Sequence, residues 1–299
     1  KTTIQSWGRL SNSAHGITHL SDPNQAIQLI QKSQGQHIAY GMGRSYGDAA
    51  LNQENNLWLT NQLNHLIAFD PKTGLLQCES GTTLQEIHRI FVPQGWMLPV
   101  TPGTQMITVG GAIGNDVHGK NHHAYGSFGD QVVAFTLVRT TGEIIDCSRT
   151  HNADWFYATL GGIGLTGVII NATLQLRRIA GPWIKAETIA YRNLEEFFAL
   201  SDSSEQDWEH TVSWIDCMNG ENAKGLFMRG NLAEDYQRAA PIIKDKRFPI
   251  TPPISLVNKA SLPLFNFAYF HRNALKKRPQ YVHYEPFFYP LDAIHDWNR

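Results

Sequence analysis

Cysteines are few in this chain, and long apolar runs are missing. The three cysteines, Cys78, Cys147 and Cys217, lie far apart and are odd in number, which excludes a disulfide framework and a zinc ribbon and suits a reducing compartment. No apolar run approaches the roughly 20 residues of a membrane span. The formal net charge of −1 argues against a nucleic-acid surface over the whole protein. We therefore expect a cytoplasmic protein, in which Cys217 is an inert buried thiol.

The common phosphate-binding motifs are missing too. The chain has no Gly-Lys-Ser/Thr run of a Walker A loop, and residues 41–48 (GMGRSYGD) do not fit G-x-G-x-x-G, because the third glycine comes one residue late. These residues nevertheless follow a short apolar run. Three glycines in seven residues allow positive φ and a close approach of the backbone to a ligand, and their amides could converge on a phosphate. A tight turn is the alternative.

Composition and patterning predict two domains. A chain of 299 residues that is 42% hydrophobic and 17% charged is globular. Helices interleave with hairpins in residues 1–180, which predicts an α+β domain. Residues 177–182 (RRIAGP) are the expected boundary, and residues 181–299 are dense in aromatics and prolines, as at Pro252 and Pro253. Because the chain begins with Lys1, we expect it to be part of a longer one.

Local signals place several elements of the first domain. Asp22, which precedes a proline, suits the N-cap of a helix. Thr83 and Glu86 form a capping box at the start of a second helix. Two hairpins and a final alternating strand are predicted over residues 66–78, 132–147 and 168–176.

Four glycine-rich loops fall in this one domain, at residues 41–47, 103–114, 119–129 and 161–167. Each lies beside a predicted strand, and turns alone do not account for all four. A long ligand that lies across the domain and touches the backbone repeatedly does account for them, and FAD has about the right length.

The loops resemble the flavin fold of vanillyl-alcohol oxidase and the aldonolactone oxidases. The resemblance is carried by residues 41–48, 102–104 (PGT) and 108–113 (TVGGAI). Further motifs are similar to the decaprenylphosphoryl-β-D-ribose 2-oxidase branch: residues 118–123 (HGKNHH), 126–129 (GSFG), 161–167 (GGIGLTG), 287–292 (FFYPLD) and 297–299 (WNR).

This resemblance implies a fold and a reaction. The fold would be α+β, with a PCMH-type FAD-binding domain of two α+β subdomains in residues 1–180. A substrate domain built on an antiparallel sheet would follow in residues 181–299. The reaction would be oxidation of a secondary alcohol of a sugar, the C2 hydroxyl of a polyprenyl-phosphate ribose, by hydride transfer to flavin N5. A partner reductase would complete an epimerisation, and a peripheral contact at the inner membrane stays open.

The resemblance also implies site residues. Residues 39–49 and Gly103 would hold the pyrophosphate and ADP, and Ile169 would touch the cofactor from the last strand. His118 and Lys120 are the implied catalytic residues. The histidine could orient the substrate or shuttle a proton, and the lysine could neutralise a phosphate or polarise a hydroxyl. The full cofactor-binding set is Ala39, Tyr40, Gly41, Met42, Gly43, Arg44, Ser45, Tyr46, Gly47, Asp48, Ala49, Gly103, Thr104, Thr108, Val109, Gly110, Gly111, Asn115, Asp116, Val117, His118 and Ile169.

Two departures from the family pattern matter. Many members of the wider superfamily carry a histidine after the G-x-G and bond it covalently to FAD, whereas this chain has Arg44 there. We therefore expect non-covalent FAD. Family members also have a C-terminal return segment that supplies a lysine near the flavin. The chain stops at Arg299 before any such segment, so we expect it to be incomplete and the main catalytic base to lie outside it.

Other interpretations remain open. An aldonolactone oxidase similar to D-arabinono-1,4-lactone oxidase is the rival within the class. A non-catalytic nucleotide- or glycan-binding protein and a metal hydrolase are rivals from other classes. His118 and His122 have the i, i+4 spacing of a helical metal site, but the neighbouring glycines oppose a helix, and we expect no metal. Histidines with a purely structural role are the alternative.

The segment of residues 265–272 (FNFAYFHR), with Lys276, Lys277 and Arg278 after it, mixes aromatics and cations. A packed helix with a solvated basic end is one interpretation. A contact with a membrane surface or a polyprenyl phosphate is the other.

Overall fold

The structure is a computed structural model that describes residues 1–236, 238–242, 246–247, 258–259, 261–275 and 278–295. The predictions that concern Pro252, Pro253, Lys276, Lys277 and residues 297–299 lie outside the described residues. The described chain divides into two compact units: residues 1–119 and 126–178 form the first, while residues 120–125 and the described residues from Ile179 on form the second. Within the described residues, the backbone therefore passes from one unit to the other three times.

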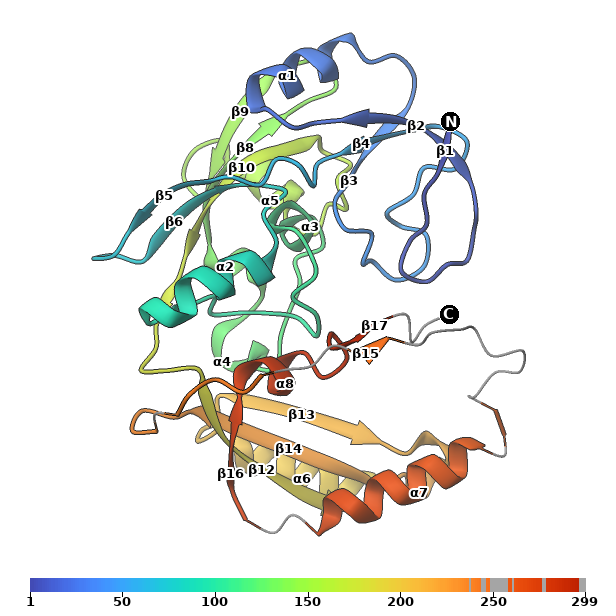
Figure 1. Cartoon of the computed structure of the whole chain (residues 1–299), viewed down its shortest axis with the longest axis vertical. Coiled ribbons are helices and arrows are strands. Elements are labelled where there is room, and N and C mark those ends of the chain that lie inside the picture. Colours follow the sequence, from blue (N-terminus) through green and yellow to red (C-terminus); the bar gives the residue numbers. More distant parts are fainter. Residues whose placement is uncertain (237, 243–245, 248–257, 260, 276–277, 296–299) are drawn as a thin grey trace. The chain divides into compact units, whose positions relative to one another are not determined.

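The first unit begins with a small α/β layer (Figure 1). Strands β2 (Ala14–His19) and β3 (His37–Tyr40) both pair in parallel with β4 (Asn56–Leu59), and β1 (Thr2–Thr3) joins the edge in antiparallel fashion. The helix α1 (Pro23–Lys32) makes the crossover. The predicted N-cap is confirmed, because the Asp22 carboxylate accepts from the amide of Gln25 at 2.9 Å.

The second part of this unit is built on a five-stranded antiparallel sheet. Its order is β5 (Leu66–Asp70), β6 (Leu75–Glu79), β10 (Val168–Gln175), β8 (Val132–Val138) and β9 (Ile144–Ser148). Helices α2 (Leu84–Phe91), α3 (Val109–Gly114) and α5 (Ala153–Thr159) contribute side chains to one buried cluster with it, including Phe91, Ile113 and Phe156. Both hairpins and the α+β class of the first domain are confirmed.

The capping box predicted for α2 is present. The Thr83 hydroxyl accepts from the amide of Glu86 at 3.2 Å, while the Glu86 carboxylate accepts from the amide of Thr83 at 2.8 Å. The helix ends in a short 3-10 turn (Val92–Gln94), and Gly95 follows in the left-handed region at φ 79°. A two-stranded ladder of β7 (Trp96–Met97) and β11 (Arg177–Arg178) closes this end of the unit.

The strand β10 does not keep one face inward along its whole length. A register shift against β8 falls between Ile169 and Asn171. As a result Val168 and Ile170 pack in the cluster that holds α1, whereas Ile169, Ala172 and Leu174 pack in the cluster that holds α3. A β-bulge has this effect because one extra residue reverses the alternation. The predicted strand is present, but its strict alternation is wrong, because Val168 and Ile170 lie on the opposite face from Ala172 and Leu174.

The second unit is built on an antiparallel sheet. Its strand order is β13 (His210–Ile215), β14 (Gly225–Leu232), β12 (Trp183–Tyr191) and β16 (Gln280–His283). The helix α6 (Leu194–Ser204) packs on one face, where the Phe197 ring lies 6.0 Å from Phe227. The helices α7 (Ser261–Ala274) and α8 (Tyr284–Phe288) meet the opposite face, since Trp214 contacts Tyr269 and His210 contacts Phe288.

The remaining elements of this unit are short. A 3-10 turn (Cys217–Asn222) joins β13 to β14, and β15 (Lys246–Arg247) pairs in parallel with β17 (Ile294–His295). Within the first turn of that 3-10 segment Cys217 is exposed, so the prediction that this thiol is buried was wrong. The other two cysteines, Cys78 and Cys147, are buried.

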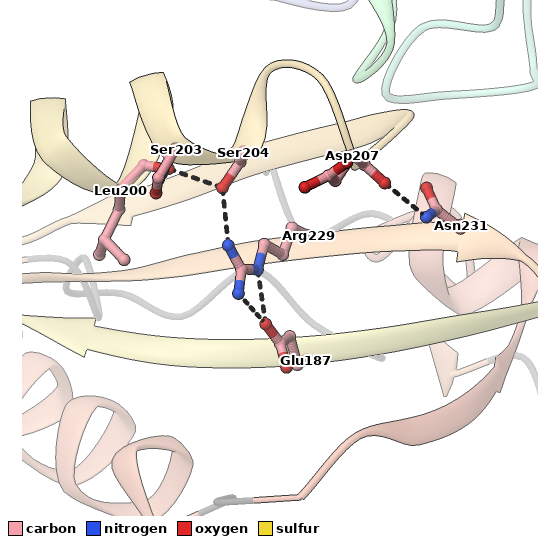
Figure 2. Close-up of polar contacts among 7 residues, drawn as sticks. All are labelled: Glu187, Leu200, Ser203, Ser204, Asp207, Arg229 and Asn231. Atoms are coloured by element: carbon pink, nitrogen blue, oxygen red, sulfur yellow. Dashed lines mark hydrogen bonds and ion pairs between the residues drawn. The ribbon is translucent and has the colours of Figure 1, made fainter.

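A polar cluster ties α6 to its sheet (Figure 2). The Arg229 guanidinium of β14 donates through Nε to Glu187 of β12 at 2.5 Å, and its Nη1 donates to the hydroxyl of Ser204 at 3.0 Å. That hydroxyl in turn donates to the carbonyl of Leu200 at 2.6 Å. The cation also lies 4.5 Å from the centroid of Trp208. Each member is therefore satisfied by another member of the cluster.

Candidate functional site

The predicted loop of residues 41–48 leaves the end of β3 and is held from behind by the N-terminal segment. The amide of Trp7 donates to the carbonyl of Gly43 at 2.7 Å, and the Ser6 hydroxyl donates to Asp48 at 3.0 Å. Gly43 and Gly47 have φ values of 60° and 61°, so both take the left-handed conformation that glycine adopts without a side-chain penalty. The loop is thus a turn held in place by the N-terminal segment, with two glycines in the left-handed conformation.

The amides of this loop are available to a ligand. Among the described residues, no group accepts a hydrogen bond from the amides of residues 42–47. Backbone N–H groups need an acceptor, and consecutive amides around positive-φ residues form anion-binding nests. The loop therefore fits the phosphates of a dinucleotide. Arg44 and Tyr46 on it are exposed, and Tyr46 contacts Trp7 edge to face.

The loop contacts the start of α3. A side chain at Gly41 would overlap the hydroxyl and methyl groups of Thr108, so the missing Cβ lets the two segments meet. Thr108 is the N-cap of α3, and its hydroxyl accepts from the amide of Gly111 at 3.1 Å. The predicted cofactor contacts on residues 41–48 and at Thr108 are therefore brought together.

Helix α3 (Val109–Gly114) differs from the prediction, which places a glycine-rich loop over residues 103–114. The amide of Val109 donates to the carbonyl of Thr82 at 2.8 Å, and that of Gly110 donates to the carbonyl of Ser80 at 2.7 Å. These two amides therefore already have hydrogen-bond acceptors within the protein and are not available to a ligand. A flavin that lies along α3 would contact the outer surface of the helix and the side chain of Thr108. The cofactor phosphates would then be bound by the amides of residues 42–47.

The turn that follows α3 is held by the two other glycine-rich loops. The amides of Gly161 and Ile163 donate to the carbonyls of Ile113 and Gly114, at 3.1 and 2.7 Å. The Asp116 carboxylate accepts from the amide of Gly129 at 2.8 Å. All four glycine-rich segments thus gather around α3, as a ligand laid across the domain requires.

Backbone strain accumulates at this turn. Asp116 and Ile163 have φ values of 41° and 54°, and a positive φ at a β-branched residue such as isoleucine is an outlier. Such strain concentrates at ligand clamps, where the surrounding structure enforces it. The predicted contacts Asn115, Asp116 and Val117 lie in this turn, with Asn115 exposed.

The remaining predicted cofactor contacts lie on either side of α3. Ile169 is only 7% exposed and packs with Ile113 in one cluster, which places it beside the helix. Gly103 lies in the open, since a Cβ added there would meet no atom of the described residues within 4 Å. The Thr104 hydroxyl accepts from the amide of Met106 at 3.1 Å and shapes the same turn.

The two predicted catalytic residues fall in different units. His118 is exposed and belongs to the first unit, where it bridges to Ser127. Lys120 begins the short segment that belongs to the second unit, and its carbonyl accepts from the amide of Thr211 at 2.8 Å. Its amine donates to the carbonyl of Phe288 in α8 at 2.9 Å. Burial lowers the pKa of Lys120 to about 8.

The histidine-rich segment does not form the helical metal pair. A single helical turn, α4 (His122–Tyr125), starts only at His122, so His118 and His122 do not share a helix. The expectation that the glycines prevent any helix here was wrong for this one turn. The His123 ring contacts the carbonyl of Trp208 at 2.8 Å. In the described part of the chain, no group of three or more His, Cys, Asp or Glu side chains is arranged to hold a metal.

Two comparisons with known proteins bear on this site. The family of the FAD binding domain matches residues 17–148, which include the loop of residues 41–48, α3 and its following turn. Decaprenylphosphoryl-β-D-ribose oxidase of Mycolicibacterium smegmatis is 32% identical over 99% of this chain and 68% of its own length. The chain belongs to the family of FAD-linked oxidases that contains that enzyme. It is thus an FAD-dependent oxidoreductase that acts on a CH–OH donor.

Two more distant relatives match only part of the chain. L-gulonolactone oxidase of Scyliorhinus torazame is 28% identical over 53% of this chain. The Δ24-sterol reductase of Homo sapiens is 28% identical over 51%. The chain spans 36% and 30% of the length of these two relatives.

Sequence reasoning missed the groups that support the site from a distance. The carbonyls of Ser80 and Thr82 hold α3, and the carbonyl of Phe288 holds Lys120 although 168 residues separate the two. No side-chain pattern could reveal them, since any residue type supplies a carbonyl.

Proposed function

We propose that this oxidase acts on the C2 hydroxyl of a polyprenyl-phosphate ribose. The near-complete match to decaprenylphosphoryl-β-D-ribose oxidase carries the proposal, because it spans 99% of the chain and so includes the second unit. The match to L-gulonolactone oxidase covers 53% of the chain, which makes an aldonolactone the weaker candidate. When bound, FAD supplies the hydride acceptor for the oxidation.

The residues of this chain would bind, orient and handle protons. The amides of residues 42–47 would donate to the cofactor phosphates, and Thr108 with residues 115–118 would lie along the flavin. In its protonated form, Lys120 would neutralise the substrate phosphate or polarise the hydroxyl. Because its pKa is lowered to about 8, a sizeable fraction of the amine is neutral at mildly alkaline pH. His118, being exposed, would orient the sugar or shuttle a proton.

The substrate test compares two ligands under anaerobic conditions. We expect a polyprenyl-phosphate ribose to bleach the oxidised-flavin absorbance within one turnover, and L-gulono-1,4-lactone to leave it unchanged. Bleaching by the lactone alone would replace the proposal with an aldonolactone oxidase. Binding of the lipid sugar without bleaching would favour a non-catalytic carrier of nucleotide and glycan.

We further propose that FAD is held without a covalent bond, since the exposed Arg44 occupies the position where a linking histidine would stand. Acid precipitation should leave the yellow colour in the supernatant; colour that stays with the pellet would contradict this. The 2-keto product would pass to a reductase that completes an epimerisation. Because the substrate carries a lipid tail, we place the reaction at the cytoplasmic side of the inner membrane. None of the described helices is long and apolar enough to cross a bilayer.

A further inference from the structure

The inner face of α7 is fixed to the sheet of the second unit. The Asn266 amide donates to the Asp216 carboxylate at 2.7 Å, in a buried position. The Tyr269 ring lies 5.0 Å from Trp214, and the Lys224 amine lies 4.8 Å from the Phe270 ring. These contacts fix the helix in rotation, and so determine which residues face outward.

The outward face of α7 is apolar. Leu264 is 72% exposed, Phe267 58%, and Leu275, directly after the helix, 78%. A spacing of three residues brings Leu264 and Phe267 to the same side of the helix. The exposed His271 follows on that side, with its ring centroid 4.2 Å from that of Phe267, and Leu275 comes after the last helical turn. Scattered exposed apolar residues are ordinary, whereas a contiguous row of large ones marks a surface that contacts another apolar phase.

The sequence that contains α7 carries charged residues of one sign. Residues 246–284 contain no Asp or Glu, while the chain as a whole has a net charge of −1. The same stretch contains seven cations: Lys246, Arg247, Lys259, Arg272, Lys276, Lys277 and Arg278. Arg272 on α7 and Arg278 just after it are exposed. Exposed apolar side chains on α7 beside the exposed cations Arg272 and Arg278 complement an anionic lipid surface.

We propose that α7 lies in the headgroup region of an anionic bilayer. Leu264, Phe267 and Leu275 would enter the boundary of the acyl chains, and Arg272 would pair with lipid phosphates. The inner face stays on the sheet, so the helix docks as a preformed element and no unfolding is needed.

Helix α7 lies on the same face of the sheet as the helix that contacts Lys120. His210 and Trp214 lie on the same face of β13 and contact α8 and α7, at a separation of roughly 13 Å along the strand. The α8 residue Phe288 holds the amine of Lys120. One face of the sheet therefore carries both the lysine and the membrane-docking helix. The docking goes beyond the proposed reaction and does not depend on it.

The test is flotation of the protein with vesicles of phosphatidylcholine and phosphatidylglycerol in a 2:1 ratio. We expect the protein to float with these vesicles at low salt and to float less as salt rises. Leu264→Glu and Phe267→Glu should each lower the membrane-bound fraction about tenfold. The matched control is Phe198→Glu on α6, where the parent side chain is 59% exposed on the opposite face, and it should float like the wild type.

Several results would overturn the proposal. These are a wild-type protein that stays at the bottom of the gradient, equal flotation of all variants, or equal capture by pure phosphatidylcholine. Circular dichroism should be the same for each variant, and if Phe267→Glu alters the fold, Leu275→Ser provides the same comparison. Oxidation of a water-soluble, short-chain prenyl-phosphate ribose should be unchanged in Phe267→Glu, so failure of docking and failure of the substrate assignment give different results.

Discussion

At the residue scale, the amine of Lys120 sets an expected pH dependence. Burial lowers its pKa from the ordinary 10.5 to about 8, so the ammonium form that would neutralise a phosphate is lost above that pH. We predict that kcat/KM falls as pH rises through about 8. Lys120→Arg should remove this falling limb, because a guanidinium stays charged, and Lys120→Met should lower kcat/KM on the order of 10²-fold at pH 7. A falling limb retained in Lys120→Arg would assign it to another group.

The same lysine predicts a change in stability with pH. Its folded-state pKa lies below the unfolded value, so between about pH 8 and 10.5 the unfolded chain binds more protons than the folded one. The free energy of unfolding should therefore rise with pH across this window, as far as Lys120 contributes. Urea titrations of the wild type and of Lys120→Met should differ in this slope. Parallel curves would contradict the buried position of the amine.

Gly41 is the residue at which the close approach of two site segments can be tested. A Cβ there would overlap Thr108, the N-cap of α3, whereas at Gly103 a Cβ would meet no described atom within 4 Å. We predict that Gly41→Ala lowers the stability of the apoprotein by about 1–3 kcal/mol. Gly103→Ala is the matched control and should leave it nearly unchanged. The comparison is made by thermal unfolding, and equal Tm values for the two variants would contradict the contact.

At the element scale, the polar cluster of Figure 2 predicts a difference between two adjacent serines of α6. Ser204 is fully buried and joins the Leu200 carbonyl to the Arg229 guanidinium, whereas Ser203 is exposed and bonds only that carbonyl. Ser204→Ala should cost about 1–3 kcal/mol because it leaves the half-buried guanidinium of Arg229 short of an acceptor. Ser203→Ala should stay within about 0.5 kcal/mol. Urea unfolding of both variants measures this difference, and equal costs would mean that the cluster does not anchor the helix.

Elements whose signals are local were predicted well. The N-cap at Asp22 and the capping box of Thr83 and Glu86 are side-chain to backbone bonds within one turn, and the sequence alone specifies them. Helix α3 escaped prediction because the run VGGAIG has poor intrinsic propensity, and tertiary bonds to Ser80 and Thr82 hold its first turn. The bulge at Ile170 escaped because register against β8 is a non-local property.

At the scale of the whole molecule, FAD binding should stabilise the first unit. Binding to the folded protein alone stabilises it by about 2.7 kcal/mol at a hundredfold excess over Kd. We predict that FAD added to the apoprotein slows hydrogen exchange most at the amides of residues 42–47, which have no acceptor among the described residues, and at the turn of residues 114–117. The amides of β12 and β14 serve as the internal reference. Slowing confined to that sheet would contradict the assignment of the cofactor to the first unit.

The fold class and the cofactor could be predicted because the motifs of the first domain resemble those of a known flavin family, and the four glycine-rich segments indicated a backbone that approaches a ligand closely. The partners that tune the site could not. Burial lowers the pKa of Lys120, and the carbonyl that accepts from its amine belongs to Phe288, 168 residues later in the chain. Exposure is similarly non-local: Cys217 is apolar in type but lies at the surface, at the start of a short connection.

The short segment of residues 120–125 lies in the chain of the first unit but is grouped with the second. A gene fragment ending at residue 178 would encode this segment without Thr211, Trp208 and Phe288, which hold it. Recombination that exchanged only the residues after 178 would therefore leave the six residues 120–125 without the groups of the second unit that they contact.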